Sequence, residues 1–216
     1  MTEKLKVNYV TSNEHKVEEN NLFVQYAKLS DGSAVADVFD FSIRRTSVTE
    51  TLEVDLVAMV IAECSFAYQQ LKVPCIVEHA GLIFDDYRAQ KYPGGLTKPM
   101  WNTLSDKFLD ETRSAGRPVT ARAVIAYCDG QTVRTFAGET HGKLSDAPRG
   151  SRHFYWDTVF IPDNPETGDL TYAEIIDDER FGLKYKVIRL SQSTKAKLAL
   201  LDHLKAVGIP PLWRVT

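Results

Sequence analysis

Residues 74–84 most constrain what this chain can fold into, because they form an apolar run that two ionisable side chains interrupt. The run, PCIVEHAGLIF, is short and rich in β-branched and aromatic residues, which is typical of a buried strand. Glu78 and His79 stand at its centre. Polar groups are costly to bury without partners, so the stretch raises the question of what a histidine does inside a sheet.

Strand and helix patterns alternate along the rest of the chain, with one antiparallel hairpin about the Asp129-Gly130 turn. This mixture predicts an α/β protein built on a mixed sheet. The pattern predicts strands at residues 5–11, 74–84 and 157–163 and a hairpin over 118–144. It predicts helices at 12–29, 48–71 with acidic residues in the first turn, 92–112 begun or interrupted at Pro99, and 191–208 ending at Gly208.

Composition excludes several classes of protein. The chain has 216 residues and a formal net charge of -3, which gives no global attraction to nucleic acid or to an acidic membrane. Cys64, Cys75 and Cys128 are far apart in sequence and lie in apolar settings, which predicts reduced core thiols. Neither a signal-peptide core nor a membrane-length apolar run is present, and no linker divides residues 1–216. We therefore expect one cytoplasmic domain.

Two segments place a lysine beside a predicted helix start, where backbone N–H groups favour anions. The first is VTSNEHK, residues 10–16, with Asn13 and Lys16, although alone it is a weak signal, since any helix can begin with Ser-Asn as an ordinary cap. The second is YPGGLTK, residues 92–98, with Lys98, which by itself is also compatible with a solvated loop lysine. Together they point to a phosphate site.

A third segment, APRGSRHFYWDTVF at residues 147–160, combines basic, aromatic and acidic residues. An aromatic face at Phe154 or Trp156 can stack on a base, and the carboxylate of Asp157 can accept a hydrogen bond from a base N–H. The alternative is that the aromatic residues pack a core and that Arg149 lies on the surface.

In their order, these segments resemble the inosine-triphosphate pyrophosphatase family over residues 7 to about 204. The motifs are Thr-x-Asn-x-x-Lys, VE-x-x-GL, PG-x-x-x-K, PRG-x-x-x-F-x-WD-x-x-F and TYAE. The resemblance implies an elongated mixed sheet in two lobes with a nucleotide-binding cleft between them, usually as a homodimer. It also implies magnesium-dependent hydrolysis of purine nucleoside triphosphates to the monophosphate and pyrophosphate.

The resemblance also implies roles for individual residues. The metal ligand best matches Glu50, although an alignment shifted by three residues would choose Glu53. Substrate contacts match Thr11, Asn13, Lys16, Lys98, Arg149, Phe154, Trp156, Asp157, Ser191 and Gln192.

Four departures from the family pattern fall at chemical positions. His79 replaces the aspartate that holds magnesium and activates water, and imidazole is a poor magnesium ligand. Glu63 replaces a substrate-contacting lysine, which predicts a carboxylate facing the triphosphate. SQS at residues 191–193 replaces SHR, which reads the purine 6-oxo group. The family pattern also has a lysine four residues before that serine. This chain has Val187 there, with Lys184 and Lys186 nearby.

Three hypotheses follow. The first is a protein that binds an inosine-type (deoxy)nucleoside triphosphate with impaired or absent hydrolysis, as a sensing or regulatory subunit with an effector partner. Bacterial anti-phage defence is one such setting, since in the Kongming type a pyrophosphatase-like subunit senses deoxyinosine triphosphate and works with an NAD-depleting effector. The second is an active pyrophosphatase in which Glu50, Glu53, Asp85 or Asp86 compensates for His79. The third is a structural paralogue that binds no nucleotide.

Overall fold

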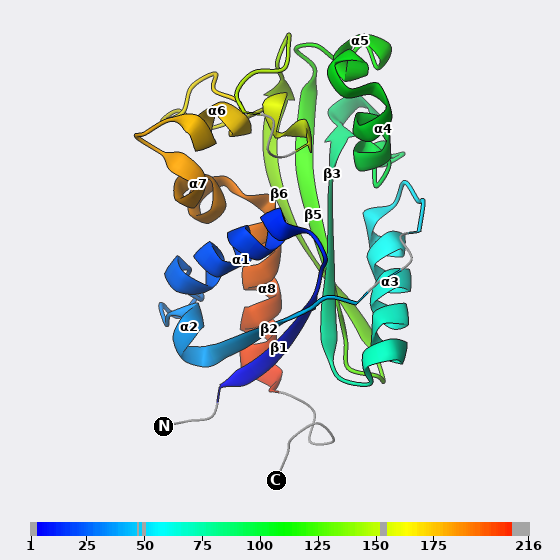
Figure 1. Cartoon of the computed structure of the whole chain (residues 1–216), viewed down its shortest axis with the longest axis vertical. Helices are drawn as coiled ribbons and strands as arrows, with labels where there is room; N and C mark the ends of the chain where they lie inside the picture. The colour runs from blue at the N-terminus through cyan, green and yellow to red at the C-terminus, as the bar shows by residue number, and fades with distance from the viewer. Residues whose placement is uncertain (1–3, 47, 49–50, 152–154, 209–216) are drawn as a thin grey trace.

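The computed structural model describes residues 4–46, 48, 51–151 and 155–208, which form a curved mixed sheet with helices on both faces (Figure 1). The strand order is β2-β1-β3-β5-β6-β7, with β4 paired to β3. β1 runs parallel to β2 and β3, and the other pairings are antiparallel. This confirms the predicted mixed α/β fold. The strands are β1 (Leu5–Val10), β2 (Phe39–Arg44), β3 (Cys75–Phe84), β4 (Pro93–Gly94), β5 (Pro118–Cys128), β6 (Val133–Leu144) and β7 (Phe160–Pro162).

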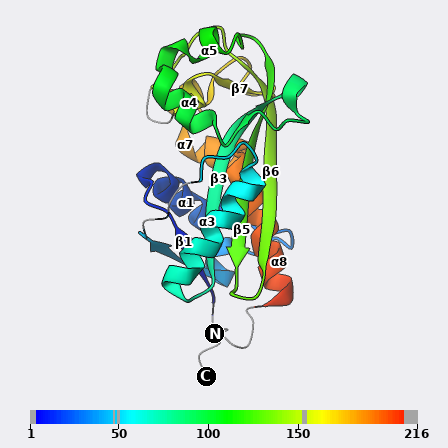
Figure 2. The ribbon, with the colours of Figure 1, turned by 90° about the vertical axis from the view of Figure 1, so that its right-hand side faces the viewer.

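The long helices cover opposite faces of the lower half of the sheet, as Figure 2 shows from the side of α3. α3 packs on β3 and β5, whereas α1 and α8 pack on the other face. No helix in the described part of the chain is long and apolar enough to cross a membrane. The helices are α1 (Glu14–Tyr26), α2 (Val35–Val38), α3 (Leu56–Leu71), α4 (Thr97–Leu104), α5 (Phe108–Glu111), α6 (Tyr172–Asp177), α7 (Gly182–Tyr185) and α8 (Gln192–Val207), with 3-10 turns η1 (Asp85–Tyr87), η2 (Ser105–Lys107) and η3 (Tyr155–Thr158) and a π-helix η4 (Lys186–Leu190).

Burial on both faces explains why β3 and β5 are apolar runs rather than alternating ones. Along β5, Ala123 and Ile125 face the core under α1 and α8, while Val124 and Ala126 face the core under α3. Side chains on a strand alternate between its two faces, so each core takes every second residue.

A third hydrophobic core fills the upper half of the molecule, between the far ends of β3, β5 and β6 and the short helices α4, α5 and α6. Leu82 and Phe84 of β3 belong to it, whereas Ile76 and Val77 of the same strand belong to the lower cores. The polar centre of β3 therefore lies where the strand passes from one lobe to the other.

The structure corrects several predicted boundaries. The helix expected over residues 48–71 begins only at Leu56, and its acidic residues precede it instead of occupying its first turn. Asp55 Oδ1 accepts from Val57 N at 2.9 Å, and Glu53 Oε1 accepts from Val54 N at 2.7 Å. Asp55 is thus the N-cap of α3, and this cap fixes the start of the helix at Leu56. The helix expected over 92–112 is divided into α4, η2 and α5.

Several elements were not predicted, among them β2, α2, α6, α7 and η4. For α6 the sequence does carry a signal, the capping box Thr171-x-x-Glu174, in which Thr171 N donates to Glu174 Oε2 at 2.9 Å and Glu174 N donates to Thr171 Oγ1 at 3.2 Å.

Candidate functional site

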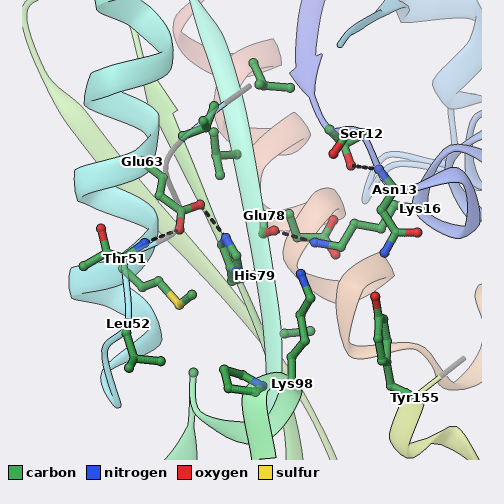
Figure 3. Close-up of a pocket in the computed structure, with 18 of the residues that line it drawn as sticks. Ser12, Asn13, Lys16, Thr51, Leu52, Glu63, Glu78, His79, Lys98 and Tyr155 are labelled. Carbon is green, nitrogen blue, oxygen red and sulfur yellow. Dashed lines mark hydrogen bonds and ion pairs between the residues drawn. The ribbon is translucent and has the colours of Figure 1, made fainter. Parts of the chain in front are cut away.

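A pocket of about 500 Å³ opens at the centre of β3, between the β1–α1 loop, the start of α3 and the start of α4 (Figure 3). A pocket of this size is within the usual range for small-molecule sites. Its lining brings together several residues that the sequence singled out, namely Thr11, Asn13, Lys16, Glu63, Glu78, His79, Lys98 and Trp156.

The β1–α1 loop forms one rim, and its conformation is fixed by its own side chains. Thr11 Oγ1 accepts from Asn13 N at 3.2 Å, and Asn13 Oδ1 caps α1 by accepting from His15 N at 3.0 Å. With this oxygen bonded in the cap, the two N–H groups of the Asn13 amide are the donors that it can offer a ligand. The rim therefore combines amide donors with the N-terminus of a 13-residue helix, which favours an anion.

Lys16 and Lys98 reach into the same space from opposite rims, as Figure 3 shows. Lys16 Nζ donates to the backbone oxygen of Glu78 at 2.6 Å, which holds the ammonium over the middle of β3. Lys98 lies in the first turn of α4, next to Thr97, whose buried hydroxyl accepts from Leu82 N at 2.9 Å. The two cations thus converge from elements that are each tied to β3.

The turn before Lys98 requires glycine. Gly94 has φ +55, and a Cβ there would lie 2.1 Å from the backbone oxygen of Val54. A Cβ on Gly81 of β3 would in turn lie 2.1 Å from the backbone oxygen of Gly94. Glycine at these two positions lets β4 pack on β3 and lets the chain before α3 pack on β4, which explains why the PGG turn and the GL of VE-x-x-GL occur together.

His79 is paired with Glu63. The imidazole Nε2 lies 2.5 Å from Glu63 Oε2, and Glu63 Oε1 accepts from Thr51 N at 3.2 Å. Glu63 is only 2% exposed. Glu63 thus lines the pocket with both of its oxygens bonded to protein groups, and its position facing a triphosphate stays a prediction.

Glu78, the other ionisable residue of β3, is the centre of a buried charge network below the pocket. Its Oε1 accepts from Ser193 Oγ at 2.8 Å, and its Oε2 accepts from Tyr9 Oη at 3.1 Å and lies 3.7 Å from Lys197 Nζ. Burial alone would raise the pKa of Glu78. The charges of Lys197 and Lys16, with the two hydroxyl hydrogen bonds, overcome that effect and lower the pKa to about 2. Glu78 is therefore ionised at neutral pH.

The segment predicted to bind the base is only partly at the pocket. Arg149 lies outside the lining, where it donates to the backbone oxygen of Asp169 at 2.5 Å and pairs with Glu174 at 3.2 Å. Trp156 reaches the pocket edge but is 3% exposed, and its ring packs against Phe160 and Tyr172. Phe154 lies outside the described residues. Tyr155 belongs to the same aromatic segment but was not among the predicted substrate contacts, and it lines the pocket as well.

Asp157 is buried in a second charge network that joins the two lobes. Its Oδ2 lies 2.8 Å from Lys186 Nζ, and Lys186 Nζ lies 2.6 Å from Glu19 of α1. Burial raises the pKa of Asp157 to about 6, an effect that the Lys186 ammonium opposes and the Glu19 carboxylate increases. The same two carboxylates raise the pKa of Lys186 despite its burial.

The π-helix η4 explains how Lys186 reaches this position. In an α-helix, a residue four places before Ser191 lies one turn below it. In η4 the turn is wider, because Ser191 N donates to the backbone oxygen of Lys186, five places earlier, at 2.9 Å. Lys186 therefore lies one turn before Ser191 in space. A count of four residues, as in an α-helix, would give Val187 instead.

The segment that replaces SHR lies outside the pocket lining. Ser191 caps α8 by accepting from Ser193 N at 3.2 Å, and Ser193 Oγ bonds to Glu78. Gln192 is 5% exposed, and its Oε1 accepts from Tyr172 Oη at 3.3 Å. The roles proposed for Ser191 and Gln192 in base binding stay predictions.

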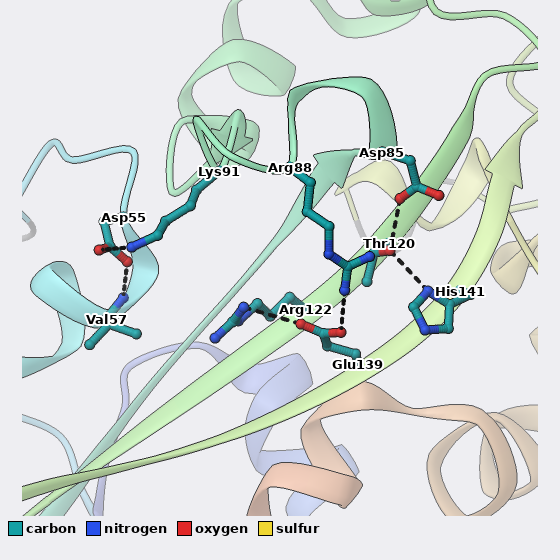
Figure 4. A network of polar contacts seen from close by, with 9 residues as sticks. All are labelled: Asp55, Val57, Asp85, Arg88, Lys91, Thr120, Arg122, Glu139 and His141. Carbon is teal, nitrogen blue, oxygen red and sulfur yellow. Dashed lines mark hydrogen bonds and ion pairs between the residues drawn. The ribbon is translucent and has the colours of Figure 1, made fainter.

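The described acids that could hold magnesium are bonded to other protein groups. No group of three or more His, Cys, Asp or Glu side chains within residues 4–46, 48, 51–151 and 155–208 is arranged to hold a metal ion. Glu53 bonds to its own backbone neighbours, and Glu50 lies outside the described residues. Asp86 pairs with Arg117 at 3.1 Å. Asp85 accepts from Thr120 in a polar network on the far part of the sheet, away from the pocket lining (Figure 4).

The comparison that decides the family is the match of the Ham1 family to residues 7–186. The chain belongs to the Ham1 family. It is 30% identical over 204 residues to the dITP/XTP pyrophosphatase of Hyperthermus butylicus, covering 93% of this chain and 95% of that enzyme. It is 27% identical over 213 residues to the inosine triphosphate pyrophosphatase of Kluyveromyces lactis, covering 95% of this chain and 99% of the relative.

Solved Ham1 structures share the fold. The Staphylococcus aureus Ham1 protein superposes with a TM-score of 0.61 at 16% identity, covering 93% of this chain and 98% of that one. A Coxiella burnetii HAM1 protein gives the same TM-score at 16% identity, with 92% and 99% covered. The resemblance to inosine-triphosphate pyrophosphatases is thereby confirmed, and this Ham1 chain is a member of a family of nucleoside-triphosphate pyrophosphatases.

Proposed function

We propose that this Ham1 chain binds an inosine-type purine (deoxy)nucleoside triphosphate in the pocket at the centre of β3 and hydrolyses it slowly or not at all. Its role is then that of a nucleotide-sensing or regulatory subunit, which acts in the cytoplasm as a homodimer with an effector protein. Bacterial anti-phage defence is the setting in which we would look first for that effector.

The observation that carries this proposal is the bond between His79 and Glu63. The imidazole stands where the resemblance calls for a catalytic carboxylate, and its Nε2 is 2.5 Å from a buried acid. A base must reach the proton that it removes, and this nitrogen already has a partner. Lys16 and Lys98, in contrast, line the pocket as an anion site requires. The binding groups are therefore present while the hydrolytic position is altered.

An active pyrophosphatase remains the alternative, because 30% identity over 93% of the chain relates it to a dITP/XTP pyrophosphatase. One experiment separates the two functions. The protein is incubated with inosine, deoxyinosine, xanthosine and ordinary purine triphosphates plus magnesium, and pyrophosphate release and calorimetric binding are measured in parallel. Binding without turnover supports the sensing function. Robust magnesium-dependent release that is lost in His79→Ala establishes the enzyme.

The site assignment has its own test in the two lysines. Loss of a charge-assisted phosphate contact costs about 1.5–3 kcal/mol, so Lys16→Ala and Lys98→Ala should each weaken triphosphate binding roughly tenfold to 150-fold. Lys205→Ala is the matched control, because Lys205 pairs with Asp31 on the surface, outside the pocket lining. Unchanged affinity in both pocket variants, with melting temperatures like the wild type, would show that the phosphates bind elsewhere.

A further inference from the structure

Two of the four altered family positions touch each other. The resemblance places a lysine on the long helix and an aspartate on the central strand, a base on the helix and an acid on the strand. Here Glu63 of α3 and His79 of β3 reverse that arrangement, with Nε2 and Oε2 2.5 Å apart. The two replacements therefore belong to one contacting pair, in which the acid now lies on the helix and the base on the strand.

This exchange removes an anchor for a divalent cation. Magnesium prefers octahedral oxygen ligands and is usually held in such sites by one or two carboxylates together with substrate phosphates. Glu63 has both oxygens bonded, to His79 and to Thr51 N, and it is 2% exposed. A metal at this point would have to displace the imidazole and then be held with oxygen ligands that the strand does not provide.

The other pocket carboxylate is equally committed. Glu78 accepts from Ser193 through Oε1 and from Tyr9 through Oε2, and Lys197 balances its charge from 3.7 Å. Its pocket-facing contribution is the backbone oxygen that accepts from Lys16. What the described lining offers to a polyphosphate is thus cationic, from Lys16 and Lys98, and not a metal held between two acids.

We infer that the pocket takes its triphosphate as the metal-free anion, an inference that rests on the proposed nucleotide binding. The two lysines and the N-terminus of α1 supply the positive charge that a divalent ion would otherwise bring. Magnesium then competes with the protein for the phosphates, so it weakens binding or leaves it unchanged.

Calorimetric titration with deoxyinosine triphosphate, in excess EDTA and in excess magnesium chloride, tests the inference directly. The expected result is an affinity in EDTA equal to or higher than that in magnesium. Binding that appears only with magnesium, or that magnesium strengthens about tenfold or more, overturns the inference and leaves the proposed binding standing. Absence of binding in both conditions overturns both.

Variants of the pair give a second readout, because its polarity can be restored. Glu63→Lys alone sets an ammonium against the imidazole, and His79→Asp alone sets two carboxylates together, so each should lower the melting temperature. The double variant E63K/H79D should recover stability beyond the sum of the single effects, as expected for residues in contact. It should also make the affinity rise with magnesium.

A swap elsewhere in the sheet serves as the matched control. Arg122 and Glu139 are cross-strand neighbours of β5 and β6 with a 3.1 Å ion pair, away from the pocket lining, and Glu139 also pairs with Arg88 at 3.0 Å (Figure 4). R122E/E139R should leave the magnesium response of the wild type unchanged. Two outcomes would contradict the inference. In the first, E63K/H79D is as unstable as the two single changes added together. In the second, the double variant still binds the triphosphate but shows no magnesium response, so the pair does not set metal use.

Discussion

Replacing Glu78 by glutamine tests the charge network that supports the pocket. Glu78 is 4% exposed, and its pKa is lowered to about 2 from the ordinary 4.5. Each unit of pKa corresponds to 1.36 kcal/mol, so ionised Glu78 stabilises the folded chain by about 3 kcal/mol at neutral pH. Lys197 would be left as a buried cation in the variant, so near pH 7 the loss should be about 3–5 kcal/mol.

The pH dependence follows from the direction of the shift. Because the pKa of Glu78 is lower in the folded chain than in the unfolded chain, its contribution is fully present above about pH 4.5 and declines as the pH falls towards 2. Near pH 3, about 2 of the 3 kcal/mol should be gone. Urea unfolding of wild type and Glu78→Gln between about pH 7 and pH 3 measures the difference, which should shrink by that amount.

Two further variants make the result interpretable. Glu139→Gln weakens two partly exposed pairs, with Arg122 and with Arg88, and should change the unfolding free energy by less than about 1 kcal/mol. Adding Lys197→Met to Glu78→Gln removes the uncompensated cation and should recover part of the loss. A cost of Glu78→Gln that is equal near pH 7 and near pH 3 would refute the reasoning, because the ionised carboxylate would then not be the stabilising species.

Two more predictions concern the segment around Trp156. Trp156→Ala should lower the unfolding free energy by about 3–5 kcal/mol without ligand, since the ring is 3% exposed and packs on Phe160 and Tyr172; a folded, stable variant that loses only affinity would assign the ring to base stacking instead. The pKa of Asp157 is raised to about 6, so its ionised form costs stability above that pH and the cost disappears as the pH falls from about 6 to 4. The stability of wild type relative to Asp157→Asn should therefore increase on acidification, by up to about 3 kcal/mol in urea unfolding, and a pH-independent difference would contradict the raised pKa.

The parts of the fold that the sequence predicted well are those governed by local periodicity. β3 and the β5–β6 hairpin are long and strongly patterned, and α8 ends at Gly208 as its sequence indicates. Lys16 and Lys98 could be assigned to one site because each stands at a helix start, and the structure places both in the pocket lining.

Contacts between distant elements could not be predicted in the same way. Glu63 and His79 lie on a helix and a strand, and nothing in either segment shows that their side chains meet. Lys197 did carry a signal, because its spacing from Leu200, Leu201 and Leu204 puts it on the apolar face of α8, where a buried cation requires an acid. The roles proposed for Glu50 and Phe154 fall on residues that the structure does not describe.

The π-helix before α8 also shows how an α-helix can hold one additional residue without a change in the surrounding fold. One residue added to an α-helix would turn everything on one side of it by about 100°, and a side chain that had faced the core would then face solvent. The wide turn of η4 holds one residue more than an α-helical turn. Lys186 and Ser191 are therefore related to each other as two residues one ordinary turn apart would be. An insertion here is therefore nearly silent to the fold. In this chain the residue one turn before Ser191 is thus Lys186, although a count of four residues along the sequence gives Val187.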